Sequence, residues 1–151
     1  MYLVNTIEQY NKKYLYFFDS IKNNIMNEGS FIRILYTTNL VTLNGIYLLV
    51  NLKEINGEKY YNKYKFTFNT TYNKEIIEKI KIIEDEILMK YNTTKKPITK
   101  IYEQLKLGYI KLFSDTKNGQ NNNFILKISG IWENQNNYGL TYKFIIPDCL
   151  P

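Results

Sequence analysis

The strongest constraint on the fold is an alternation of apolar and polar residues between positions 123 and 144. Apolar side chains recur at every second position on both sides of an Asn-rich gap, which predicts two antiparallel strands joined by a short turn. The apolar set is Phe124, Leu126, Ile128, Trp132, Leu140, Tyr142 and Phe144. The other set carries lysines among small polar residues, so we expect a β-hairpin with one buried face and one basic face. A basic sheet face is a candidate surface for nucleic acid.

The first 29 residues predict a helix. Asn5 can cap it, and Glu8, three residues on, completes a capping-box pattern. Apolar residues then recur at three- and four-residue steps, as in an amphipathic helix. These residues are Tyr10, Tyr14, Phe17, Ile21 and Ile25. We expect a helix from about Thr6 to Asn27, ended by Gly29.

From residue 30 the period changes to two, which predicts a meander of antiparallel strands over residues 30–70. The expected strands are Phe31–Thr37, Leu40–Leu43, Ile46–Ile55 and Lys59–Asn69. The pairs Asn44-Gly45 and Asn56-Gly57 predict hairpin turns, because both central residues of a type I′ turn need a positive φ. The first pair also fits a bulge within one long strand.

Two helices are expected between the strand groups, over residues 73–106. Asn73 can cap the first helix, whose isoleucines share one face. Its acidic run, Glu84 to Glu86, has lysines nearby and is typical of a solvated helix face. The second helix is short, begins at Pro97 and ends before Gly108. Strands then return at Tyr109–Ser114, Asn123–Glu133 and Tyr138–Ile146.

This order predicts a single α+β domain over residues 1–151, with an N-terminal helix (1–29), a strand meander (30–70), helices (73–106) and C-terminal strands (107–146). An antiparallel sheet of five to seven strands, with a helix inserted between two strand groups, has the order of an OB-fold barrel. A simple helix-covered antiparallel sheet fits the same order nearly as well.

The composition argues against catalysis. The chain has no histidine and one cysteine, Cys149, which excludes Ser-His-Asp and Cys-His nucleophile systems, histidine-containing zinc sites and thiolate metal cages. The sequence contains neither a phosphate-binding loop motif nor a dinucleotide fingerprint. We therefore expect a binding protein, not an enzyme, with no cofactor and no metal ion. One cysteine and no apolar run near the roughly 20 residues of a membrane span predict an intracellular protein without a membrane partner.

The charge is positive, since 20 Lys and Arg residues against 14 Asp and Glu residues give a formal net charge of +6. Abundant Asn, Ile, Lys and Tyr indicate A/T-rich codons, so part of the lysine excess follows from codon use. Asparagine could have filled many of these positions under the same bias. The remaining charge favours a polyanionic partner or a role in solubility.

Strand alternation places a set of cations and rings on outward sheet faces. Single-stranded nucleic acid needs cations to meet its phosphates and flat rings to stack its bases. The candidate nucleic-acid-binding residues are Arg33, Tyr61, Lys63, Lys65, Tyr109, Lys111, Phe113, Lys127 and Lys143. The alternative interpretation is that these lysines only solubilise an outer face. Trp132 has the parity of the core residues and is expected to be buried, with base stacking as the alternative role.

The run Phe124-Ile-Leu-Lys-Ile-Ser-Gly-Ile-Trp-Glu133, with Tyr138-Gly-Leu-Thr-Tyr-Lys-Phe144, resembles the C-terminal strands of small proteins encoded by large AT-rich DNA viruses. The overall order resembles viral single-stranded-DNA-binding proteins of OB type. The resemblance implies a non-catalytic protein that coats exposed strands in replication or recombination without sequence preference. Its partner would be single-stranded nucleic acid, DNA favoured, and it could also associate with copies of itself and with replication proteins. It would act in the host cytoplasm or nucleus, or at a viral replication site.

Two other functions remain open from the sequence. The first is a viral structural or protein-interaction module that assembles through its aromatic sheet faces. The second is a nuclease or other enzyme that uses Asp and Glu with a divalent metal.

Overall fold

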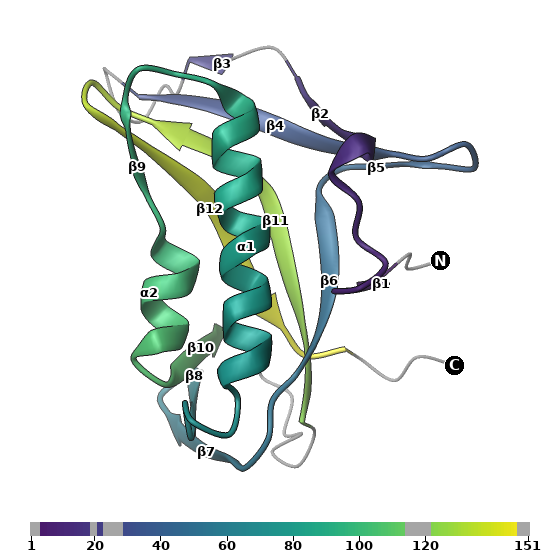
Figure 1. Cartoon of the computed structure of the whole chain (residues 1–151). Coiled ribbons are helices and arrows are strands. Elements are labelled where there is room, and N and C mark those ends of the chain that lie inside the picture. The colour runs from purple at the N-terminus through teal and green to yellow at the C-terminus, as the bar shows by residue number, and fades with distance from the viewer. Residues whose placement is uncertain (1–3, 19–20, 23–28, 114–121, 148–151) are drawn as a thin grey trace.

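The computed structural model describes residues 4–18, 21–22, 29–113 and 122–147, which form two sheets and two α-helices (Figure 1). The predicted α+β class is confirmed. Neither sheet closes into a barrel within the described residues. Cys149 lies outside these residues, as do the side chains of Tyr60 and Phe113.

Strand β11 (Asn123–Glu133) is the centre of the large sheet. On one side it pairs antiparallel with β12 (Asn137–Ile145), which confirms the predicted hairpin. On the other side, β6 (Ile46–Asn51) pairs with the first half of β11 and β4 (Ser30–Thr37) pairs with its second half. The long strand β11 therefore aligns β4, β6 and β12 within one sheet.

Five short strands complete this nine-stranded sheet. They are β1 (Asn5–Thr6), β2 (Leu15–Phe17), β3 (Ile21–Lys22), β5 (Thr42–Leu43) and β9 (Lys96–Ile98). β1 pairs in parallel with β6, and β9 pairs in parallel with β12, while the other three pair antiparallel with β4. Pro97 thus lies in an edge strand, where its missing N–H is tolerated, and not at the start of a helix.

The predicted N-terminal helix is wrong for the residues that the structure describes. A short 3₁₀ turn, η1 (Lys12–Tyr14), leads into β2, whose Leu15 is fully buried and whose Tyr16 is exposed. Aromatic residues suit a strand, and β4 presents an edge with which they pair, so strand pairing replaces the helix. Lys90 of the first helix fixes this segment by donating from Nζ to the Lys12 and Leu15 carbonyls at 2.9 and 2.6 Å.

The small sheet has three antiparallel strands in the order β10 (Tyr109–Phe113), β8 (Lys63–Phe68) and β7 (Ile55–Tyr60). The predicted single strand over residues 59–69 is wrong, because a turn at Tyr61-Asn62 separates β7 from β8. The predicted turn at Asn56-Gly57 is wrong as well. Gly57 lies inside β7 against the Phe66 ring, where an added Cβ would come within 2.8 Å of Cε1.

Asn44-Gly45 forms a corner, not a hairpin turn. β5, just before it, pairs with β4, whereas β6, just after it, pairs with β11. Gly45 has a φ of 117°, and an added Cβ would lie 2.7 Å from the Ile128 carbonyl oxygen, so glycine is needed here. The hairpin between β4 and β5 turns instead at residues 38–41, where Thr38 N–H donates to the Val41 carbonyl at 2.9 Å.

Helix α1 (Lys74–Tyr91) lies across one face of the large sheet, and α2 (Lys100–Lys106) lies beside it (Figure 1). The predicted apolar face of α1 is confirmed, since Ile77, Ile80, Ile83, Ile87 and Leu88 are buried. One hydrophobic cluster includes residues of both sheets and both helices, and the rings of Phe66 and Phe124, 5.1 Å apart, join the two sheets.

Glu84 was expected on the solvated face of α1 and is instead fully buried. Its two carboxylate oxygens accept hydrogen bonds from the backbone N–H groups of Ile101 and Tyr102 at 3.0 and 2.9 Å. These N–H groups lie in the first turn of α2 and have no partner within the helix. Glu84 therefore caps α2 from a neighbouring helix.

Candidate nucleic-acid interface

The outer face of the small sheet gathers one group of predicted residues. Phe66 and Ile110 on its inner face are fully buried, so alternate residues of β8 and β10 point outward. We call the outward residues Lys63, Lys65, Tyr109 and Lys111 the small-sheet patch. The alternation predicted for these two strands is confirmed.

Lys65 and Lys111 are direct cross-strand partners in this patch. Their Nζ atoms lie 4.9 and 5.5 Å from the centre of the Tyr109 ring. Like charges directly opposite each other destabilise a sheet, and the ring face compensates part of that repulsion. The patch therefore places two cations against one partly exposed ring.

The outer face of the large sheet carries a second group. Lys127 and Lys143 are direct cross-strand partners on β11 and β12, and Tyr47 of β6 is the other cross-strand partner of Lys127. Lys127 Nζ lies 5.5 Å from the centre of the Tyr47 ring. Arg33, opposite Gly130 on β4, is exposed on the same face. We call Arg33, Tyr47, Lys127 and Lys143 the large-sheet patch.

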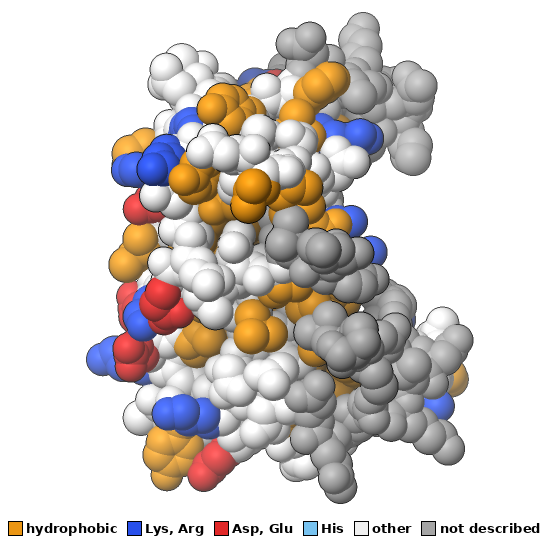
Figure 2. All heavy atoms as spheres, turned by 90° about the vertical axis from the view of Figure 1, so that its right-hand side faces the viewer, with side chains coloured by type: hydrophobic (Ala, Val, Ile, Leu, Met, Phe, Trp, Pro, Cys, Tyr) orange, Lys and Arg blue, Asp and Glu red, His pale blue; other side chains and the backbone are white. Residues whose placement is uncertain are grey.

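Carboxylates are not paired with most of these cations. Among the described residues, the ion pairs join Lys79 to Glu8 and Glu75, and Lys95 to Glu133. None includes Lys65, Lys111, Lys127, Lys143 or Arg33. Figure 2 shows acidic and basic side chains mixed along the margin formed by α1, and basic side chains along the opposite margin. The charges of these five residues are thus available to an anionic partner.

The predicted residues do not form one groove on one sheet. They divide between the two sheets, although β10, which carries Lys111, is packed beside β12, which carries Lys143. Tyr61 belongs to neither face, because it occupies the turn between β7 and β8 with a φ of 58° and is 94% exposed. Phe113 is the cross-strand partner of Lys63, but its side chain lies outside the described residues.

No protein-family model, curated protein or solved structure matches this chain. The patches must therefore be interpreted from their own chemistry. Across the described ranges, no group of three or more acidic or cysteine side chains is arranged to hold a metal ion. In the same ranges, no helix is both long and apolar enough to cross a membrane.

Trp132 was expected in the core, and this prediction is wrong. The register of β11 shifts between Ile128 and Gly130, so the residues after this bulge change face. Ile131 becomes the fully buried residue, and Trp132 is partly exposed on the outer face. Gly130, inside a strand pattern, was the sequence signal for such a bulge.

Phe31 lies beside Trp132 on this outer face as its cross-strand partner. Each ring covers a glycine of the neighbouring strand. An added Cβ at Gly130 would come within 2.6 Å of Phe31 Cζ, and one at Gly139 within 2.8 Å of Trp132 Cζ2. The outer face thus has two rings near Arg33 that the sequence did not assign to it.

Proposed function

We propose that this protein binds single-stranded nucleic acid, DNA favoured, without catalysing a reaction. The observation that carries the proposal is the pair of opposed lysines on each sheet, Lys65 with Lys111 and Lys127 with Lys143. Each pair includes a lysine whose ammonium lies over a tyrosine ring, and neither pair has a carboxylate partner among the described residues. Cations beside rings are what a phosphate backbone with unpaired bases requires.

Sequence-independent coating of exposed strands is the mode that fits these side chains. Lysines contact phosphates without reading bases, and rings stack on any base. Residues 124–133 and 138–144 resemble C-terminal strands of small proteins encoded by large AT-rich DNA viruses, and the overall order of elements resembles viral single-strand binders of OB type. Both resemblances support a role in viral replication or recombination inside the host cell. The order of strand group, helix and strand group supports an open relative of the OB-fold.

The direct test is a titration of a labelled single strand, followed by fluorescence anisotropy, beside the matching duplex. We expect the single strand to bind more tightly, and its affinity to fall steeply with salt because bound lysines release counterions. Equal affinity for the single strand and the duplex, or an affinity that does not change with salt concentration, would contradict the proposal.

A protein-interaction module is the second candidate, favoured by exposed apolar side chains near β4. Tyr16 and Phe18 are each 55% exposed, and Leu40, at the tip of the hairpin between β4 and β5, is 95% exposed. Such a module should assemble in the absence of nucleic acid. Light scattering of the protein alone, compared with the protein saturated with oligonucleotide, separates the two functions.

A further inference from the structure

A pocket of about 470 Å³ lies at the end of β11. Its walls come from three parts of the chain: the start of β4, the connection from β9 to α2, and the end of β11. The lining includes Ser30, Ile98, Lys100, Trp132, Glu133 and Asn134. Its volume falls within the range of roughly 300 to 1,000 Å³ that is usual for small-ligand sites.

Trp132 and Lys100 make one wall of this pocket. The bulge in β11 turns the indole out of the core, and Gly139 leaves room for the ring on the neighbouring strand. Lys100 Nζ, from the first residue of α2, lies 4.8 Å from the centre of the indole ring. A flat ring and a cation from different elements therefore meet at the same wall.

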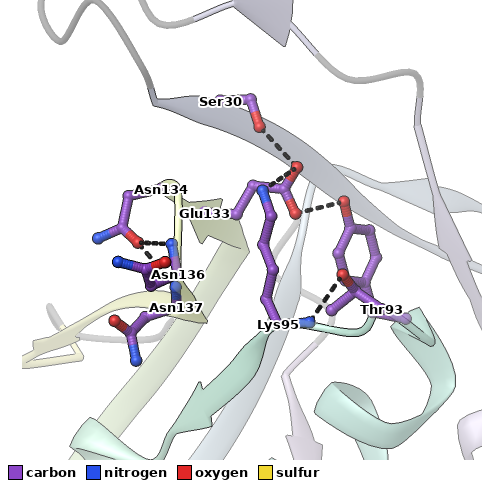
Figure 3. Close-up of polar contacts among 8 residues, drawn as sticks. Ser30, Thr93, Lys95, Glu133, Asn134, Asn136 and Asn137 are labelled. Carbon is purple, nitrogen blue, oxygen red and sulfur yellow. Dashed lines mark hydrogen bonds and ion pairs between the residues drawn. The ribbon is translucent and has the colours of Figure 1, made fainter.

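Glu133 also lines this pocket, and hydrogen bonds and an ion pair hold its carboxylate in place (Figure 3). Its Oε1 accepts from Ser30 Oγ at 3.0 Å and lies 3.5 Å from Lys95 Nζ, and its Oε2 accepts from Tyr91 OH at 3.1 Å. Burial, and then the hydrogen bond to Glu133, raise the pKa of Tyr91 to about 12, so this hydroxyl remains a donor at neutral pH. Lys95 balances the carboxylate, which leaves Lys100 as the lining cation without an ion pair among the described residues.

We propose that this pocket receives one base of a bound single strand, which stacks on Trp132 while an adjacent phosphate contacts Lys100. The inference rests on the proposed function and adds a defined base site to it. Base–aromatic stacking needs a ring face and does not depend on base identity. The base would therefore replace the Lys100 ammonium over the indole, and this flexible side chain would turn to the adjacent phosphate. Trp132 lies on the same outer face as Arg33, Lys127 and Lys143, so a strand on the large-sheet patch would pass this pocket.

The chain contains one tryptophan, so its emission reports on this pocket alone. The experiment titrates the full chain with oligothymidylate of about 20 nucleotides, longer than the site of one such domain. Binding is followed by anisotropy of a labelled strand and, in parallel, by Trp132 emission and its quenching by acrylamide. We expect emission to change with the same midpoint as anisotropy, and the bound strand to protect Trp132 from acrylamide.

Variants separate stacking from charge. Trp132→Leu should weaken binding about 5- to 150-fold without changing the salt dependence, and Trp132→Phe should restore most of the affinity. Lys100→Gln should lower the slope of log affinity against log salt by about 0.7, whereas Lys106→Gln, at the exposed end of the same helix, should not.

The outcomes distinguish this inference from the function on which it rests. If the strand binds by anisotropy while Trp132 emission and acrylamide quenching stay unchanged, the base site is wrong and the proposed function stands. If no strand binds at low salt, both are wrong. The emission test uses the unaltered chain, so its result holds even where a Trp132 variant fails to fold.

Discussion

Lys65 and Lys111 face each other across the ladder between β8 and β10, and both ammonium groups lie over the ring of Tyr109. Replacing both lysines with glutamine should weaken single-strand binding about 10- to 30-fold at about 0.1 M salt, and should reduce the salt slope by about 1.4. The free energy of unfolding should stay constant or rise by a few tenths of a kcal/mol, because a like-charge pair is removed. Anisotropy titrations and urea unfolding measure the two effects.

The matched control replaces Lys74 and Lys106, exposed lysines on the two helices. This pair of changes removes the same charge from the chain but should leave the salt slope near that of the unaltered protein. If both double variants lose the same affinity, net charge alone attracts the strand, and the small-sheet patch is not a specific binding surface.

Tyr109 should contribute stacking and not charge. Tyr109→Ala should lower single-strand affinity about 5- to 150-fold, with the salt slope unchanged, because stacking on a ring is worth about 1 to 3 kcal/mol per base. Tyr109→Phe keeps the ring and should bind nearly as the unaltered protein does. If the phenylalanine variant loses as much affinity as the alanine variant, the hydroxyl and not the ring face is responsible.

Glu84 should make stability depend on pH. Burial raises the pKa of this carboxyl to about 7 from 4.5, and the nearby charges of Asp85 and Glu103 add to the rise while the two backbone hydrogen bonds oppose it. Between these pH values the folded chain binds more protons than the unfolded chain. The free energy of unfolding should therefore fall as pH rises through this window, by at most about 3 kcal/mol.

Urea unfolding at a series of pH values measures this dependence. Glu84→Gln cannot titrate, so its stability should change less across the same window, although it keeps only one acceptor for the two N–H groups of α2. A stability that stays constant from pH 5 to pH 7 in the unaltered chain, as in this variant, would show that the Glu84 carboxyl is ionised throughout.

Gly130 should be among the least replaceable residues of β11. An added Cβ would lie 2.4 Å from the Ile32 carbonyl oxygen and 2.6 Å from Phe31 Cζ, so backbone and ring would both have to move. Gly130→Ala should therefore lower the free energy of unfolding by about 1 to 3 kcal/mol. Ser129→Ala, one residue away in the bulge, should change it much less, and thermal unfolding of both variants tests the difference.

Sequence patterns alone predicted those helices and strands whose type follows from the spacing of their apolar residues. The hairpin of β11 and β12, the strand from Ser30 to Thr37 and the helix from Lys74 to Tyr91 follow from alternation or from isoleucines on one face. The outward positions of Lys65, Lys111 and Lys127 follow from the same alternation. Their orientation could be predicted without knowledge of tertiary contacts.

The features that sequence reasoning missed depend on contacts distant in the chain. Leu15 joins a strand because β4 presents an edge to it, and Glu84 is buried because the first turn of α2 needs acceptors. Trp132 lies on the other face because β11 has one extra residue in its pairing with β12. The alternation of apolar residues in the sequence does not reveal this bulge. The division of the site between two sheets arises at residues 52–54, which separate β6 of the large sheet from β7 of the small sheet, although alternation predicted one strand from Ile46 to Ile55.

The most direct test of the central claim is the affinity of the unaltered chain for a single strand at two salt concentrations. If Lys65, Lys111, Lys127 and Lys143 each neutralise one phosphate, affinity should fall about 50-fold between about 50 and 200 mM salt, and the matching duplex should bind more weakly. Affinity that is the same at both salt concentrations, or a duplex that binds as tightly as the single strand, would contradict the account.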